Sequence, residues 1–167
     1  MSTTSLISVE EYLATSFPDG DREYLEGQIL ERNMGEIDHS DVQTTLAVFL
    51  RVNYPQYWSG TEVRVQVRAR RFRVPDIALV LGEKPQGRML TAPPFLVVEV
   101  LSPEDRMSEM QERINDYLEF GISYVWVIDP ETHRTHVHTA EGSRESKDGV
   151  LRTSNPNIEV PLSKIFR

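Results

Sequence analysis

The feature that most constrains the fold is a set of three short apolar segments, two of which contain an acidic residue where the pattern favours an apolar one. These segments are Phe72 to Leu81, Pro94 to Leu101 and Tyr124 to Asp129. Segments of this length that are rich in valine and isoleucine are typical of strands covered on both faces. The sequence therefore predicts a sheet whose central strands lie buried between two layers.

The chain between the last two of these segments has the pattern of an amphipathic helix. Ser102 is predicted to cap this helix, with Pro103 in its first position, and Gly121 is predicted to end it. The predicted apolar stripe consists of Met107, Met110, Ile114, Tyr117 and Leu118. A strand, a helix and a second strand in this order are typical of a βαβ unit. We therefore predict an α/β fold, with a mixed sheet flanked by helices.

Three further local patterns extend this scheme. Apolar residues spaced as on one helical face predict a helix from Asp38 to about Asn53. The segment 22–33 predicts two short strands around a Glu-Gly turn, after a turn at 17–20. Alternating polar and apolar residues from Glu62 to Val67 predict a half-buried strand.

Composition excludes several classes of protein. The chain has no cysteine, which excludes disulfide frameworks and thiolate metal sites and fits a cytoplasmic location. It has no run of 18 apolar residues, so we expect neither a membrane span nor a membrane partner. With 167 residues and no internal repeat or long linker, the chain is predicted to form one domain, 1–167.

Asp76 and Glu99 are the acidic residues within the apolar segments, and each shares a strand face with apolar neighbours. A lone buried carboxylate costs several kcal/mol unless it is paired with or bound to a cation. Two such acids in neighbouring strands predict a shared positive partner, and oxygen ligands suit Mg²⁺ or Mn²⁺. The alternative is that each acid lies near a strand end in water, or pairs with an arginine.

A basic stretch lies between Glu62 and Arg73, in a chain whose formal net charge is −8. Its five arginines are Arg64, Arg68, Arg70, Arg71 and Arg73. The charge of the whole chain opposes non-specific binding to phosphates, whereas this stretch is a candidate contact for a nucleic-acid backbone. The alternative is that arginines in a hairpin keep its edge from pairing with other strands.

Four motifs carry a resemblance to a known family: Val74 to Ile77, Leu96 to Pro103, Tyr117 to Gly121 and Val125 to Pro130. With them the chain resembles, from about residue 10 to residue 166, the Uma-two family of bacterial restriction-endonuclease-like proteins, part of the PD-(D/E)xK nuclease superfamily. The resemblance implies a restriction-endonuclease-like fold. It also implies a metal-dependent endonuclease that hydrolyses phosphodiester bonds in DNA, with Mg²⁺ or Mn²⁺ as cofactor. The sequence leaves open whether the protein forms a homodimer.

The resemblance also implies roles for particular acidic residues. Asp76 and Glu99 match the acids of the superfamily motif, and Glu23 matches an N-terminal family acid that completes the metal site. His39 matches a recurrent family histidine at the start of a helix. Three acids that converge without a metal must repel one another, so we expect at least one of them to have a pKa above its ordinary value.

The chain departs from the superfamily pattern at the lysine. Two positions after Glu99 is Leu101, and the basic residue implied by the resemblance is Arg113, four residues before Tyr117. Arginine can bind phosphate but is not a plausible general base. We therefore predict an endonuclease with Asp76, Glu99 and Arg113 as its catalytic residues. The alternatives are a catalytically weakened nucleic-acid-binding or assembly protein that keeps the fold and, for Arg113 itself, a solvated surface position.

Overall fold

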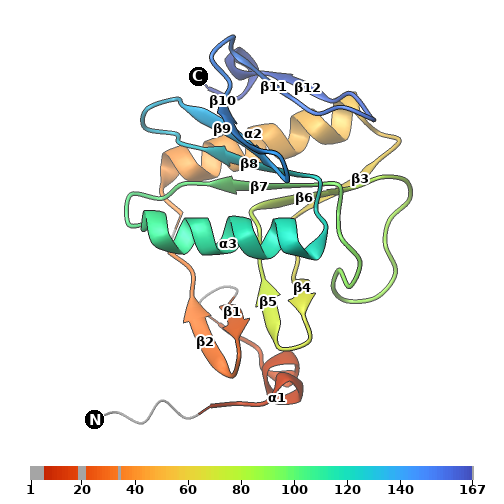
Figure 1. The fold of residues 1–167 in the computed structure, drawn as a ribbon, viewed down its shortest axis with the longest axis vertical. Helices are drawn as coiled ribbons and strands as arrows, with labels where there is room; N and C mark the ends of the chain where they lie inside the picture. Colours follow the sequence, from red (N-terminus) through yellow and green to blue (C-terminus); the bar gives the residue numbers. More distant parts are fainter. Residues whose placement is uncertain (1–5, 19–21, 34, 167) are drawn as a thin grey trace.

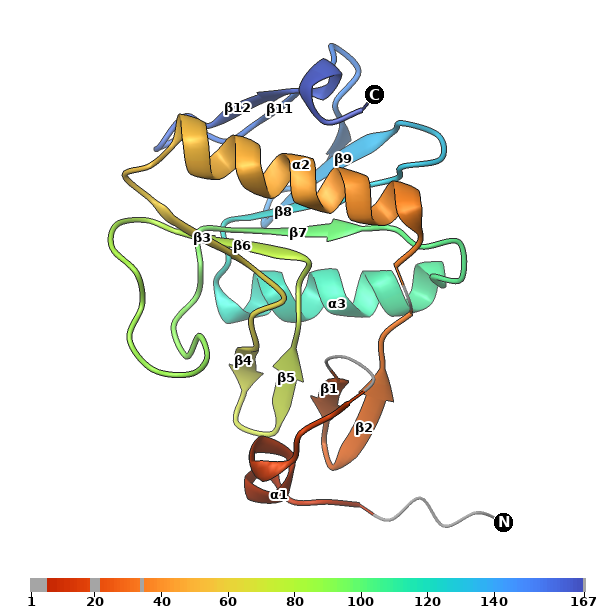
Figure 2. The same ribbon diagram turned by 180° about the vertical axis from the view of Figure 1, so that it is seen from behind.

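The computed structural model describes residues 6–18, 22–33 and 35–166. A six-stranded mixed sheet, in the order β10-β9-β8-β7-β6-β3, lies between two helices (Figures 1 and 2). Its strands are, in chain order, β3 (Trp58–Thr61), β6 (Ile77–Val80), β7 (Leu96–Val100), β8 (Tyr124–Ile128), β9 (Thr135–Thr139) and β10 (Gly142–Glu145). Only β7 and β8 pair in parallel within this sheet.

The predicted βαβ unit is present as β7, α3 (Met107–Phe120) and β8. The helix begins later than predicted, because Arg106 and not Ser102 is its N-cap. Residues 102–105 instead form a turn, in which the Ser102 backbone N–H donates to the Asp105 carboxylate at 2.7 Å. Gly121 ends the helix as predicted, in the left-handed conformation with φ 105°.

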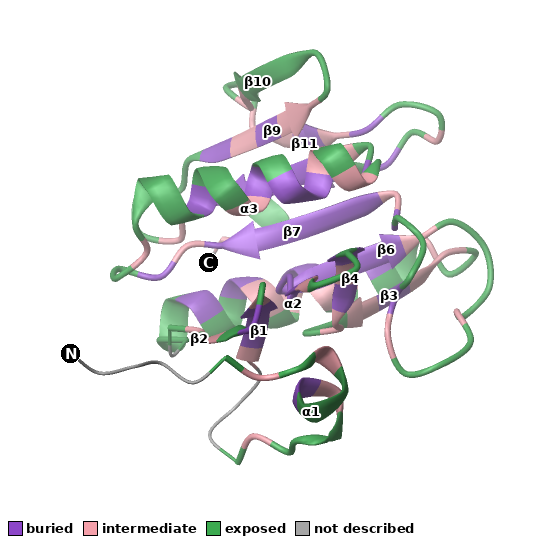
Figure 3. Cartoon of the chain, turned by 60° about the horizontal axis from the view of Figure 1, so that its bottom comes forward, coloured by how far each residue is buried: buried purple, intermediate pink, exposed green. Residues whose placement is uncertain are grey.

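The two faces of the six-stranded sheet are each covered by one helix. On one face, α2 (Ile37–Asn53) buries Val42, Leu46 and Leu50. On the other, α3 buries Met110, Ile114 and Tyr117. Met107 does not join this apolar stripe and is 79% exposed, since it stands in the first position of the helix. All five residues of β7 are buried, as expected for a strand between two layers (Figure 3).

A second, four-stranded antiparallel sheet, in the order β2-β1-β5-β4, lies with α1 at one end of the molecule (Figure 1). Its elements are α1 (Val9–Ala14), β1 (Arg22–Leu25), β2 (Gln28–Glu31), β4 (Val65–Arg68) and β5 (Arg71–Arg73). The predicted hairpin is therefore confirmed, as β1 and β2. The turn predicted at 17–20 extends outside the described residues.

The segment that was predicted as one strand from Phe72 to Leu81 divides between the two sheets. Its first part is β5 in the small sheet and its second part is β6 in the large one. Pro75 lies between them and cannot donate a backbone hydrogen bond to a ladder, which favours a break at this point. Asp76 is therefore not inside a strand but at the crossing from one sheet to the other.

The C-terminal part of the chain extends the core on the α2 side. It contains β11 (Val150–Arg152), β12 (Glu159–Pro161) and the short 3-10 helix η1 (Leu162–Lys164). Leu151, Val160 and Ile165 from this part are fully buried in the same core as α2. Among the residues that the structure describes, no helix combines the length and apolar character needed to cross a membrane.

Candidate active site

Asp76 and Glu99 lie at the same end of two adjacent strands. β6 and β7 pair antiparallel with Ile77 opposite Val98, so Asp76, just before β6, is beside Glu99 in β7. Asp76 is 1% exposed and Glu99 is 2% exposed. The Val100 backbone N–H donates to Asp76 Oδ2 at 2.7 Å and ties the start of β6 to β7. The prediction of two buried acids in neighbouring elements is therefore confirmed.

Glu23 and Arg113 complete the same region. Glu23 lies in β1, is 1% exposed, and accepts hydrogen bonds from the Val74 N–H at 3.1 Å and from Arg73 Nη1 at 2.8 Å. Arg113 lies in α3 between two acids, with Nε 3.6 Å from Glu23 Oε2 and Nη1 3.9 Å from Glu99 Oε2. Its side chain is 13% exposed, so the alternative of a solvated surface arginine is wrong.

Tyr117 follows Arg113 by one helical turn on the same face of α3. Its hydroxyl donates to Glu99 Oε1 at 2.6 Å. Burial, together with the charges of Glu99 and Glu23, raises the pKa of Tyr117 well above its ordinary value. The phenol therefore keeps its proton and acts as a donor that orients Glu99.

Arg32 is the residue of this region that the sequence analysis missed. It directly follows β2, and its Nη2 lies 2.6 Å from Asp76 Oδ1. His39, in the first turn of α2, places Nε2 3.3 Å from the same oxygen. The alternative in which a buried acid pairs with an arginine is therefore correct for Asp76. We call Glu23, Arg32, His39, Asp76, Glu99, Arg113 and Tyr117 the site cluster.

The two central acids have pKa values shifted in opposite directions. Burial would raise the pKa of Asp76, but the hydrogen bond from His39 and the charge of Arg32 lower it. Burial and the charge of Asp76 raise the pKa of Glu99 to about 7, against the opposing effect of Arg113. The expectation that one of the converging acids has a raised pKa is confirmed at Glu99. The hydrogen bond to Asp76 also raises the pKa of His39, although its burial acts in the other direction.

Three of the five arginines of the basic stretch are held by acids of α3. Arg73 Nη2 lies 2.7 Å from Asp116 Oδ2, Arg71 Nη1 lies 2.9 Å from Asp116 Oδ1, and Arg68 pairs with Glu119. The Arg73 side chain is 3% exposed. The predicted nucleic-acid contact at Arg73 is therefore wrong, because its guanidinium is enclosed by carboxylates. We call Arg68, Arg71, Arg73, Glu112, Asp116 and Glu119 the hairpin cluster.

The other two arginines of the stretch lie away from this cluster. Arg64 is partly buried, and its guanidinium carbon lies 4.9 Å from the centre of the Tyr12 ring, within the range of a cation–π contact. Arg70 is exposed in the turn between β4 and β5. A phosphate contact stays a prediction for these two residues.

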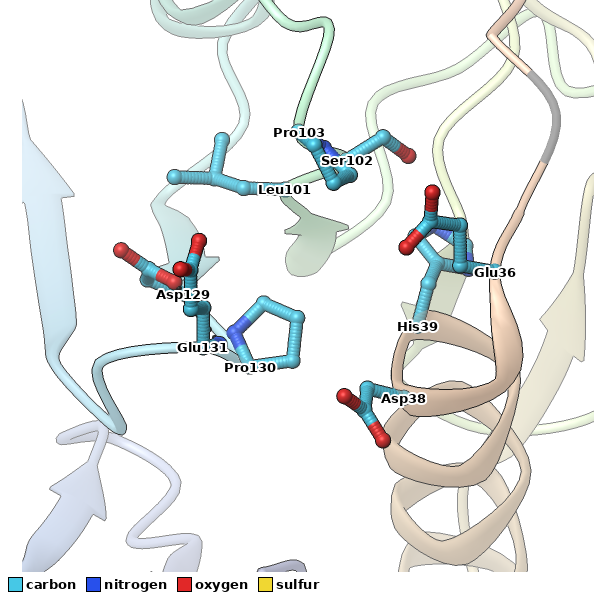
Figure 4. Close-up of a pocket in the computed structure, with 9 residues that line it drawn as sticks. All are labelled: Glu36, Asp38, His39, Leu101, Ser102, Pro103, Asp129, Pro130 and Glu131. Carbon is cyan, nitrogen blue, oxygen red and sulfur yellow. Dashed lines mark hydrogen bonds between the residues drawn. The ribbon is translucent and has the colours of Figure 1, made fainter.

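A cleft of about 490 Å³ opens beside the site cluster. Glu36, Asp38 and His39 at the start of α2 form one wall, and the segments after β7 and β8, with Asp129 and Glu131, form the other (Figure 4). His39 connects this cleft to Asp76. Because the walls carry four acids, their field opposes the approach of a phosphate in the absence of added cations.

The comparisons with known proteins agree with this fold. A family model described as "Putative restriction endonuclease", Uma2, matches residues 9–163. The chain belongs to the Uma2 family. The crystal structure of a "putative nuclease belonging to DUF820" from Anabaena variabilis is similar, with a TM-score of 0.79 and 20% identity over 96% of this chain and 97% of that one. The fold is thus restriction-endonuclease-like, as expected. A comparison with curated protein sequences gives no match.

Membership of the Uma2 family raises the question of a divalent metal, which restriction-endonuclease-like proteins generally use. The site cluster fits Mg²⁺ or Mn²⁺ in the chemistry of its donors, since it gathers buried carboxylates and a histidine. Within the described ranges, however, no three acidic or histidine side chains stand close enough to share one ion. Arg32 already binds one oxygen of Asp76. The donor types therefore suit a divalent ion held by one or two of these carboxylates together with water, on the condition that Arg32 leaves Asp76.

Proposed function

We propose that this Uma2 protein is a metal-dependent endonuclease that hydrolyses phosphodiester bonds in DNA. The observation that carries the proposal is a group of three acids that are nearly inaccessible to solvent, with Arg113 between Glu23 and Glu99, and with Asp76, just before the neighbouring strand, beside Glu99. The burial of three carboxylates costs free energy, and such groups are concentrated at functional sites. Because the chain belongs to the Uma2 family, nuclease chemistry is the function that this site supports best.

Within this proposal, Asp76 and Glu99 would hold Mg²⁺ or Mn²⁺, and Glu23, which Arg73 already binds, would join them only after a rearrangement of the site. Such an ion, when bound, supplies polarisation of the scissile phosphate and a lowered pKa for the attacking water. Asp76 is oriented for this role by the Val100 N–H and by His39. Glu99 is oriented by the Tyr117 hydroxyl.

Arg113 supplies positive charge where the phosphate gains negative charge in the transition state. Burial would lower the pKa of Arg113, but the charges of Glu99 and Glu23 raise it further above neutrality, so its guanidinium stays protonated. Arg113 cannot take a proton from water and acts by electrostatic stabilisation alone. It also lines an opening of about 500 Å³ between the β1–β2 hairpin and α3, which gives it access to solvent.

A second candidate function is a nucleic-acid-binding protein that keeps the nuclease fold with weakened catalysis. The observation that favours it is the contact of 2.6 Å between Arg32 and Asp76, which occupies a proposed metal ligand. The presence of Arg113 in place of a lysine favours it as well, because arginine cannot serve as a base.

The nicking of supercoiled plasmid DNA in the presence of Mn²⁺ separates the two functions. We expect the wild-type protein to nick the plasmid and Asp76→Asn to show no activity at equal purity. Arg134→Gln is the matched control. It also removes an arginine, but this arginine is exposed, pairs with Glu145 and lies outside the site cluster. Equal activity in wild type and Asp76→Asn would identify a contaminant and overturn the proposal. DNA binding without nicking would favour the second candidate.

A further inference from the structure

Arg32 is a cation that the chain itself provides to the site cluster. Its side chain is 16% exposed, and its Nη2 makes the shortest contact of Asp76 with a cationic group, at 2.6 Å. Burial would lower the pKa of Arg32, but the charges of Asp76, Glu99, Glu23 and Glu62 raise it. Its positive charge is therefore stabilised by the acids that the proposed function assigns to a metal.

The partners of Asp76 leave little of its carboxylate unused. Oδ2 accepts from the Val100 N–H at 2.7 Å, while Oδ1 faces both Arg32 and His39. A divalent ion needs direct carboxylate oxygens, and a metal and a guanidinium repel each other at one oxygen. The two cations are thus mutually exclusive at Asp76 Oδ1.

Arg32 is placed so that it can move away. It lies after the last residue of β2, outside the strand ladder. A second acid, Glu62, is half exposed, and its Oε1 lies 3.7 Å from Arg32 Nη1. A guanidinium released from Asp76 therefore finds a carboxylate near solvent. Arg73 also has a half-exposed acid nearby, since Glu112 Oε1 lies 3.7 Å from its Nη2, but Arg73 is held by two buried acids, Glu23 and Asp116, where Arg32 is held by one.

From these contacts we propose that Arg32 is an internal competitor of the metal ion, which holds Asp76 until a divalent cation displaces it toward Glu62. The inference rests on the proposed function, because it takes Asp76 as a metal ligand. It adds that Arg32 weakens the binding of metal. The observed free energy of metal binding is the free energy of the contact between the metal and Asp76, less the free energy of the contact between Arg32 and Asp76. The same contact with Arg32 keeps buried Asp76 compensated while no metal is bound.

The test is a calorimetric titration of the protein with Mn²⁺ alone, without DNA. We expect Arg32→Gln to bind Mn²⁺ about tenfold or more tightly than the wild type, the order of effect that one neighbouring charge has on a carboxylate. Arg134→Gln, which removes an exposed arginine, should bind Mn²⁺ as the wild type does. We also expect Mn²⁺ to raise the melting temperature of Arg32→Gln more than that of the wild type.

Two outcomes separate the failure of this inference from the failure of the proposed function. An affinity of Arg32→Gln equal to that of the wild type, together with loss of Mn²⁺ binding in Asp76→Asn, would overturn the competition and leave the metal site in place. Mn²⁺ binding that survives Asp76→Asn in both the wild-type and the Arg32→Gln background would overturn the metal site, and the competition with it.

Arg32→Lys keeps the test valid if Arg32→Gln does not fold. Lysine retains the positive charge that Asp76 needs, but its ammonium is strongly hydrated and lacks the planar fork of a guanidinium. We expect Arg32→Lys to hold Asp76 less firmly and to bind Mn²⁺ several-fold more tightly than the wild type. An unchanged affinity in a folded Arg32→Lys protein would count against the competition.

Discussion

In the hairpin cluster the arginines of β4 and β5 meet acids that all come from one helix, α3, whereas in the site cluster the acids come from β1, the start of β6 and β7. The hairpin cluster has three arginines and three acids. The site cluster has Arg32 and Arg113 against Glu23, Asp76 and Glu99, with His39 beside Asp76. Arg73 of the hairpin cluster also binds Glu23, so the two clusters share this cation, and the site cluster alone contains an acid, Glu99, whose pKa burial and Asp76 raise to about 7.

The comparison indicates that the buried charges of the hairpin cluster stabilise the structure, whereas those of the site cluster are suited to chemistry. Arg73 is enclosed by two buried carboxylates and fixes the small sheet against α3. Arg32 is held by one buried acid, Asp76, and its other acid partner, Glu62, is half exposed, so fewer buried contacts oppose its exchange. Burial, and after it the charge of Asp76, raise the pKa of Glu99 to about 7, which makes Glu99 the acid of the site cluster that titrates near neutral pH.

The largest expected effect comes from breaking the hairpin cluster at Arg73. Arg73→Met leaves Glu23 and Asp116 buried without their main cation, which is expected to lower the free energy of unfolding by about 3–5 kcal/mol. Denaturant unfolding measures this loss. Arg134→Gln, at an exposed pair, should change the free energy of unfolding far less, because solvent screens the charges of such a pair. A loss for Arg73→Met no larger than that of the control would contradict a structural role.

A second prediction concerns catalysis at Arg113. Arg113→Ala removes the charge beside Glu23 and Glu99 and is expected to lower the rate of plasmid nicking by about 10²–10³-fold, as for the loss of one electrostatic donor. Arg113→Lys keeps the charge and should retain or raise activity. The folded fraction of each variant, followed by circular dichroism, is the control. Full activity in a folded Arg113→Ala protein would remove Arg113 from the catalytic residues.

A third prediction concerns pH and Glu99. Its pKa in the folded state, about 7, lies above its ordinary value of 4.5. The folded state therefore binds the proton more tightly than the unfolded state, and the stability gained at low pH is lost as the pH rises through 7, by at most about 3 kcal/mol. Charged His39 contributes with the same sign, because its pKa is raised as well.

Unfolding in denaturant between about pH 5 and pH 8 measures this effect. Glu99→Gln keeps the shape of the side chain and the partner of Tyr117 but removes the titration. We expect its metal-free stability to depend less on pH than that of the wild type. The same slope in both proteins would show that Glu99 is not the titrating group.

The smallest expected effect is at Arg70, the exposed arginine of the basic stretch. Arg70→Gln should change the free energy of unfolding by no more than about 0.5 kcal/mol, as for most surface substitutions. If Arg70 contacts a phosphate, the variant should bind DNA more weakly and with a salt dependence reduced by about one unit. Unchanged DNA affinity would leave the basic stretch without a nucleic-acid role at this position.

The sequence was sufficient for those parts of the molecule that depend on local pattern. Buried β7 and β8, α2 and the end of α3 follow from apolar periodicity and from Gly121. The start of α3 did not follow, because residues 102–105 close a separate turn, in which Asp105 binds the Ser102 backbone N–H, and the helix begins only after Arg106. The division of one apolar segment between two sheets was not predicted either: Pro75 indicates a break, but it does not show that the two halves join different sheets.

For the site, the sequence identified the acids but not all of their partners. Asp76 and Glu99 were visible because a charge within an apolar strand is costly. Arg32 carries no such signal, as it follows a short exposed hairpin strand and reaches Asp76 only through the packing of two sheets. Nor could sequence separate Arg73, bound between acids, from exposed Arg70, because both belong to one arginine-rich segment.

A crystal soaked in Mn²⁺ tests whether the site cluster is a metal centre. The account predicts an anomalous peak about 2.1 Å from carboxylate oxygens of Asp76 and Glu99, with Arg32 turned from Asp76 toward Glu62. A crystal of Asp76→Asn under the same conditions should lack the peak. A wild-type crystal in which Mn²⁺ binds only to the acids of the outer cleft, with Arg32 still on Asp76, would contradict the metal-dependent nuclease proposed for this protein.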